Sequence, residues 1–106
     1  MEMNYKRPFY QYVKKVHKPL QLAIEDAVEL ISCNPEIGKS KVGDLVGIRV
    51  YKFCFNRQEY LIAYRCLMDS PATNLITNLD ILAIDFYQVG SHQNFYDALK
   101  RYLRRE

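Results

Sequence analysis

The stretch 48–67 restricts the possible folds of this chain more than any other. Along 48–55 and again along 59–67, successive residues alternate between two largely apolar sets, and the polar tripeptide Asn56-Arg57-Gln58 separates the two runs. A period of two predicts β-strands, and so short a separation predicts that the strands pair antiparallel. Because both faces of this pair are largely apolar, we expect helices over one face and a groove or a partner over part of the other.

The flanking segments supply the remaining elements of an α+β fold. Residues Pro8 to Val16 and Leu20 to Cys33 carry apolar side chains at helical spacing, and Lys18-Pro19 separates them because the residue before proline avoids the helical conformation. So short a break predicts an N-terminal helical hairpin, in which each helix covers the other's apolar stripe and both share a face for the sheet. Asp80 to Val89 is predicted to be a third strand, and a last helix is predicted from His92 to about Arg105.

Two segments between these elements have the composition of loops. Residues 36–47 contain glycines and the lysines Lys39 and Lys41, and they predict a mobile basic loop. The glycine spacing in this loop lacks the Gly-Lys-Ser/Thr ending of a phosphate-binding P-loop, and no strand precedes it, which argues against a nucleotide site. Residues 68–79 predict a long polar loop.

Composition and charge narrow the possible functions. A chain of 106 residues, 49% hydrophobic and 25% charged, fits one domain over 1–106. Its formal net charge of +3 allows an RNA, DNA or acidic protein partner. The three cysteines show no metal-ligand spacing, so we expect buried thiols in a reducing cytoplasm, and no metal or cofactor. No apolar run approaches the roughly 20 residues of a membrane span, so we expect a cytoplasmic protein without a membrane partner.

The best candidate for an acid/base residue lies between the third strand and the last helix. Gly90 permits a tight exit from a strand, Ser91 is a good helix N-cap, and helical spacing would place His92 and Tyr96 on one face. Histidine has an unperturbed pKa of about 6.5 and can transfer protons near neutral pH. A structural role stays open for both residues, since His92 could hydrogen-bond near the cap and Tyr96 could be a core aromatic.

Three motifs connect the chain with a known family. The first predicted strand opens with Gly47-x-Arg49, the second reads Glu59-Tyr60-Leu61-Ile62-Ala63-Tyr64-Arg65, and the last helix is reached through Gly90-Ser91-His92-x-x-Phe95-Tyr96. In this order after two helices, they resemble the RelE/ParE superfamily of toxins from bacterial type II toxin-antitoxin systems, over almost the whole chain from about Lys18. The resemblance implies a helical hairpin packed on a small twisted antiparallel sheet, a C-terminal helix and a cognate antitoxin as partner.

The superfamily contains toxins that cut mRNA on the ribosome and toxins that poison DNA gyrase, and fold alone does not distinguish them. The closing motif is similar to that of YafQ-like mRNA interferases, which implies an endoribonuclease that uses acid/base catalysis without metal. On that resemblance His92 is a general acid or base, Tyr96 stacks on or orients a base, and Lys52 occupies the place of another active-site histidine.

RNA cleavage also needs cations that stabilise charge on the phosphate. The available cations are Arg49, Arg65, Lys39 and Lys41. A structural alternative stays open for Arg49, which could pair with a nearby carboxylate and hold the basic loop.

The chain departs from the nuclease pattern at two positions. The active-site arginine that nuclease members often carry on the second strand falls at Leu61, and the one shortly before the closing glycine falls at Gln88. Losing two such cations would slow cleavage by several orders of magnitude unless Lys52, Arg49 or Arg65 replaces them. A ParE-like gyrase inhibitor and a catalytically inactive antitoxin-binding module therefore remain as alternatives to the mRNA interferase.

Overall fold

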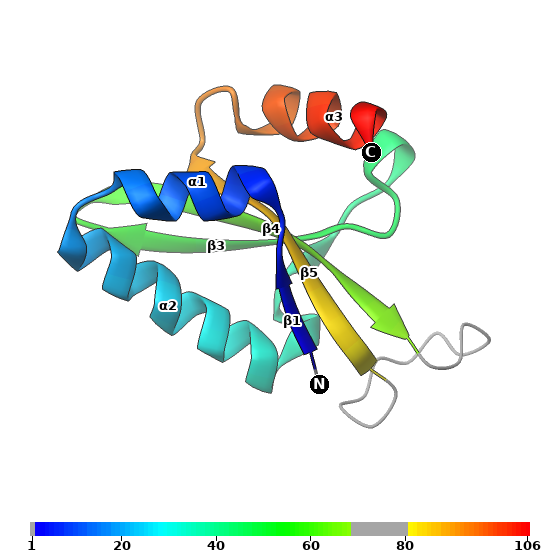
Figure 1. Cartoon of the computed structure of the whole chain (residues 1–106), viewed down its shortest axis with the longest axis horizontal. Helices are drawn as coiled ribbons and strands as arrows, with labels where there is room; N and C mark the ends of the chain where they lie inside the picture. The colour runs from blue at the N-terminus through cyan, green and yellow to red at the C-terminus, as the bar shows by residue number, and fades with distance from the viewer. Residues whose placement is uncertain (1, 69–80) are drawn as a thin grey trace.

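The computed structural model describes residues 2–68 and 81–106, and its centre is a five-stranded sheet in the order β1-β5-β4-β3-β2 (Figure 1). The strands are β1 (Glu2–Tyr5), β2 (Lys39–Ser40), β3 (Arg49–Phe55), β4 (Gln58–Met68) and β5 (Ile81–Ser91). The helices are α1 (Arg7–Lys15), α2 (Lys18–Cys33) and α3 (Phe95–Arg105), with short 3₁₀ helices η1 (Pro35–Ile37) and η2 (Gly43–Leu45). Of the polar loop predicted at 68–79, residues 69–79 lie outside the described residues.

The α+β class and the predicted central hairpin are confirmed. β3 and β4 pair antiparallel from Arg49 opposite Tyr64 to Phe55 opposite Gln58. Between them Asn56 and Arg57 both adopt positive φ, of 52° and 65°. Two such residues in a row form the tight turn whose twist matches a β-hairpin.

The prediction that the chain begins with a helical hairpin on an antiparallel sheet is wrong in two respects. The chain begins with β1, which pairs parallel with β5 from Glu2 opposite Ala83 to Tyr5 opposite Phe86, so the sheet is mixed. The N–H group of Lys6 continues this ladder by donating to the carbonyl of Phe86 at 2.9 Å. Such a short strand has too few residues for a detectable alternation, and it forms because β5 offers an unpaired edge.

The two N-terminal helices also differ from the predicted arrangement. The break before Pro19 is confirmed, because α2 begins at Lys18 with the proline in its first turn. However, α1 packs mainly against β5, and α2 packs against β3 and η1, so each helix covers the sheet more than it covers the other. Their shared core contains apolar residues of both helices and of the sheet: Phe9, Leu20, Ile24, Ala27, Ile31, Tyr60, Ile62, Tyr64, Ile81, Ile84, Phe86 and Val89.

The opposite face of the sheet is covered from within the chain. We expected a groove or a partner there, but α3 and the segment around η2 lie over this face and form a second core with it. The buried members of this second core are Leu45, Ile48, Val50, Leu61, Ala63, Tyr87, Phe95 and Leu99. The fold therefore has three layers, with α1 and α2 on one side of the sheet and α3 on the other.

The predicted basic loop at 36–47 contains β2, η2 and most of η1, and the side chain of Tyr64 anchors its first part. The Tyr64 hydroxyl accepts a hydrogen bond from the Gly38 N–H at 2.8 Å and donates one to the Pro35 carbonyl at 2.5 Å. A Cβ atom at Gly38 would lie only 2.6 Å from that hydroxyl, so glycine allows the close approach. Burial raises the pKa of Tyr64 to about 12.

This anchor predicts a loss of stability in alkali. Since the pKa of Tyr64 is near 12 in the folded protein and 10.0 ordinarily, its contribution is complete below pH 10 and is lost as the pH rises through 12. Thermal unfolding followed by circular dichroism should show a falling Tm across that range. Tyr64→Phe should flatten the fall and lower the free energy of unfolding by about 1 to 3 kcal/mol at neutral pH, because two backbone groups lose their partner.

Tyr10→Phe is the matched control, since Tyr10 is exposed. It should leave the alkaline profile unchanged. If the Tm of the Tyr64→Phe variant falls with pH in the same way as that of the wild type, the buried hydroxyl does not cause the alkaline loss. Burial also raises the pKa of Tyr87 to about 12, so part of the fall should persist in the Tyr64→Phe variant.

Candidate functional site

The junction between β5 and α3 differs from the predicted helix start. Ser91 is still part of β5 and pairs with Tyr60, while α3 begins only at Phe95. The N-cap is Asn94, which adopts a left-handed conformation with φ of 62° and makes no side-chain capping hydrogen bond. The predictions that Ser91 caps the helix and that the helix starts at His92 are therefore wrong, because pairing with β4 continues the strand through Ser91.

His92 and Tyr96 nevertheless lie together. Their ring centroids are 6.1 Å apart with an angle of 71° between the planes, so one ring edge faces the other ring. Phe95 meets Tyr96 edge-on as well, with centroids 5.3 Å apart, and Phe95 is buried in the second core. His92 is exposed, and Tyr96 is partly buried. The turn before α3 thus holds an accessible imidazole against a supported aromatic ring.

Lys41, which directly follows the edge strand β2, also contacts Tyr96. Its ammonium lies over the Tyr96 ring, 5.2 Å from the centroid, which is within the range of a cation–π interaction. Its backbone N–H donates to the Ile48 carbonyl at 3.0 Å and so continues the pairing of β2 with β3. The fold therefore gathers His92, Tyr96 and Lys41 from two segments that are far apart in sequence.

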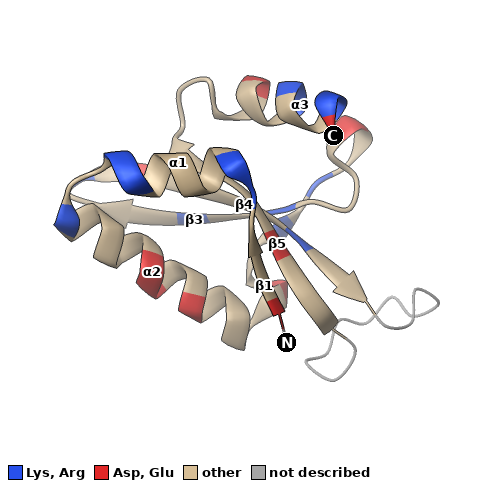
Figure 2. Cartoon of the chain, viewed as in Figure 1, with Lys and Arg blue, Asp and Glu red and all other residues tan. Residues whose placement is uncertain are grey.

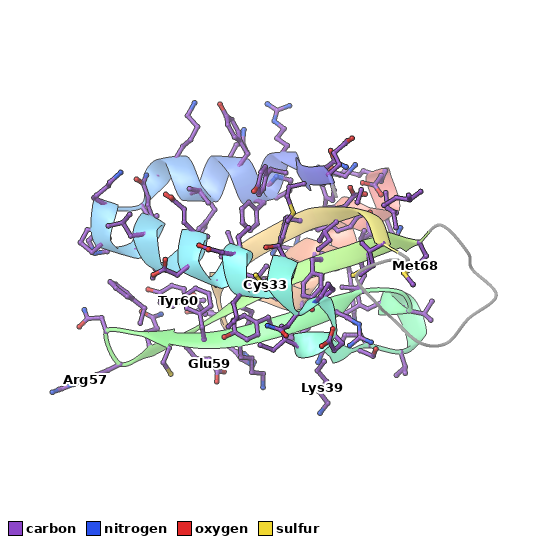
Figure 3. The ribbon with its side chains drawn as sticks, turned by 90° about the horizontal axis from the view of Figure 1, so that it is seen from below. Cys33, Lys39, Arg57, Glu59, Tyr60 and Met68 are labelled. Atoms are coloured by element: carbon purple, nitrogen blue, oxygen red, sulfur yellow. The ribbon has the colours of Figure 1, made fainter. Side chains whose placement is uncertain are left out.

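Strand geometry places two further lysines on the same face of the sheet as Lys41. Lys39 pairs with Val50, and side chains two residues apart in a strand point to the same face, so Lys39, Lys41 and Lys52 share the face that α3 covers. Lys39 and Lys52 are exposed, and Figure 3 shows the Lys39 side chain extending away from the sheet. We call Lys39, Lys41 and Lys52 the lysine edge. In the part of the chain that the structure describes, no hydrogen bond or ion pair joins Lys52 to His92.

The two predicted phosphate-binding arginines lie elsewhere. Arg49 donates to the Glu36 carbonyl at 3.1 Å and to the Gly38 carbonyl at 2.7 Å, so it holds the basic loop, although through backbone oxygens rather than a carboxylate. The Arg65 guanidinium stacks over the Tyr87 ring at 5.4 Å. Arg65 lies five residues along β4 from Tyr60, the partner of Ser91, a separation of roughly 16 Å. The structure does not bring these arginines to His92.

The two positions without the nuclease arginines are interior. Leu61 is 0% exposed and belongs to the second core beneath α3. Gln88 is 8% exposed, and its side-chain amide donates to the Phe95 carbonyl at 2.9 Å. Both residues therefore support the start of α3, and sequence reasoning missed this function of Gln88 because the hydrogen bond depends on how α3 lies on the sheet.

The cysteines are less buried than predicted. Cys33 and Cys54 are exposed and Cys66 is half-buried, so the prediction of buried thiols is wrong for the first two.

Within the described residues there is no group of three or more His, Cys, Asp or Glu side chains that could hold a metal ion. A hollow of about 560 Å³ lies between α1, α2 and β1, away from His92. None of the helices in residues 2–68 and 81–106 has both the length and the hydropathy of a membrane-spanning segment.

Comparison with known proteins agrees with the superfamily resemblance. The family model described as "ParE-like toxin of type II bacterial toxin-antitoxin system" matches residues 3–100. No curated protein matches the chain. The matched region includes nearly all of the described sheet, all of α1 and α2, and the His92–Tyr96 pair. The chain therefore belongs to the family of ParE-like toxins of type II bacterial toxin-antitoxin systems.

Proposed function

We propose that this toxin cuts mRNA on the ribosome, in the bacterial cytoplasm, with His92 as the proton-transfer residue. The observation that supports this most is the grouping of His92, Tyr96 and Lys41, which combines an exposed imidazole, an aromatic ring and a cation. As a type II toxin the chain also has a cognate antitoxin.

The grouping suits cleavage by the RNA's own 2′-hydroxyl. His92 takes the proton from that hydroxyl as its oxygen attacks the neighbouring phosphorus. The bond from phosphorus to the 5′-oxygen breaks, and the protonated imidazole returns the proton to that oxygen. The products are a 2′,3′-cyclic phosphate and a 5′-hydroxyl end.

The lysine edge supplies positive charge in place of the missing arginines. Lys41 stabilises the additional negative charge on the phosphorus oxygens, and Lys39 and Lys52 bind flanking phosphates. Tyr96 positions His92 and Lys41 and offers its exposed part to a base. Arg49 and Arg65 have no part in this proposal, since their guanidinium groups already bind backbone carbonyls and the Tyr87 ring.

A gyrase-directed activity is the second candidate, and the burial of Leu61 and Gln88 favours it. These two positions hold the arginines of the nuclease pattern, but here they are uncharged and interior, so neither supplies a cation to a phosphate at the surface. A toxin that acts by binding gyrase needs no such cation for catalysis.

Mapping transcript ends after brief induction separates the two candidates. In cells that lack the antitoxin, the nuclease predicts new 5′-hydroxyl ends within translated mRNAs, detected by primer extension within minutes of induction. Intact transcripts together with a DNA-damage response and co-purification of gyrase would instead support the second candidate. Normal growth and intact transcripts would point to an inactive antitoxin-binding module.

A further inference from the structure

The connection between β2 and β3 presents two aliphatic side chains to solvent. Val42 is 84% exposed and Val46 is 71% exposed, the highest values among the large hydrophobic residues that the structure describes. Between them Leu45 is buried in the second core, so the segment is anchored at its centre. Gly43 and Gly47 have positive φ, of 67° and 89°. The backbone is thus shaped so that the anchor points inward while both valines point outward.

Basic side chains of α3 lie next to this segment. Asp44, Lys100, Leu103 and Arg104 line one hollow of about 340 Å³ between η2 and α3. Figure 1 shows the η2 segment beside the C-terminal end of α3, and Figure 2 shows the basic residues there. Acidic residues gather instead on α2, on the other side of the sheet (Figure 2). Asp44 lies between the two valines in the chain and connects their segment with this hollow. We call Val42 and Val46, together with Lys100, Leu103 and Arg104 of the adjacent hollow, the valine patch.

The chemistry of the valine patch suits a protein better than RNA. RNA-binding surfaces combine cations with aromatic rings on which bases stack, and valine side chains offer no such ring. Exposed aliphatic groups with a polar rim are typical of protein–protein contacts. Of the residues that line the hollow, Lys100 and Arg104 are basic and Asp44 is acidic. The complementary partner is therefore a segment with apolar side chains flanked by carboxylates.

We propose that the valine patch is a docking surface for an acidic, apolar segment of the cognate antitoxin. Lys41 immediately precedes Val42 and lies over the Tyr96 ring, so a segment bound here would extend beside the His92–Tyr96 pair. This last point rests on the proposed function, since it explains inhibition as exclusion of RNA from that pair. The docking itself depends only on the patch and on the existence of an antitoxin.

The test measures binding of the cognate antitoxin to purified full-length toxin, which is co-expressed with that antitoxin and then separated from it. Val42→Asp combined with Val46→Asp should raise the Kd at least about tenfold, because both side chains would be buried in the complex and would meet carboxylates. Arg104→Glu should raise the Kd as well and reduce its dependence on salt. Circular dichroism verifies folding, and the milder pair Val42→Ser and Val46→Ser serves if the aspartates disturb it.

Leu22→Asp is the matched control, since Leu22 is 48% exposed and lies on α2. It should leave the Kd within about twofold of that of the parent, as for an exposed residue outside an interface. An unchanged Kd for the valine variants, or a larger loss from Leu22→Asp, would overturn the proposal. The same valine variants in wild-type toxin also report on RNA. Retained antitoxin binding with lost mRNA cleavage would reassign the patch to the toxin's target and would overturn the docking.

Discussion

Replacing His92 with glutamine should lower mRNA cleavage by about 10² to 10⁴-fold, the usual loss when a proton-transfer residue is removed. Glutamine keeps a polar side chain of similar length but cannot exchange a proton near neutral pH. Because His92 is exposed and precedes α3, the substitution should leave the Tm unchanged within the effect of an ordinary surface replacement. Growth arrest should disappear in cells without the antitoxin, and the new 5′-hydroxyl ends should disappear with it.

His17→Gln is the control because His17 is the other histidine of the chain. It is exposed, precedes α2 and meets the edge of Phe55 with centroids 6.0 Å apart. His17→Gln should cut transcripts at the wild-type rate. Wild-type cleavage by His92→Gln would remove His92 from the mechanism. Loss of growth arrest without any change in transcripts would mean instead that His92 contacts a protein target such as gyrase.

Leu61→Arg should unfold the protein rather than improve its activity. The substitution restores the residue type of nuclease relatives, but the Leu61 side chain is fully buried in the second core. An arginine there would place an unpaired charge in an apolar interior, at a cost of about 4 kcal/mol or more. Since a typical domain has only about 5 to 15 kcal/mol of stability, chemical denaturation should show a greatly reduced free energy of unfolding or no folded state.

Leu61→Met is the volume-conserving control and should lose less than about 1.5 kcal/mol. If Leu61→Arg keeps the wild-type stability, α3 must leave the sheet readily enough for the guanidinium to reach solvent. In that case the arginine position would be accessible, and the same variant should then show increased mRNA cleavage.

The longer elements could be predicted because their signals are local. The alternation along 48–55 and 59–67 corresponds to β3 and β4, and the helical spacing of the N-terminal segments corresponds to α1 and α2. A strand or helix of this length contains enough residues for its period to be recognised. β1 and β2 are too short to show a period, and their hydrogen bonds connect them to strands that are remote in the chain. Their pairing therefore depends on tertiary structure.

For the candidate site, the proximity of His92 and Tyr96 could be predicted, because the two residues are only four positions apart in the chain. The superfamily could also be predicted from the sequence, and the family match over residues 3–100 supports it. The sequence could not show that Lys41 joins them, that Arg49 and Arg65 do not, or that Leu61 and Gln88 are interior. These positions follow from the face of the sheet that α3 covers and from the strand edge beside it, and both depend on packing between segments far apart in the chain.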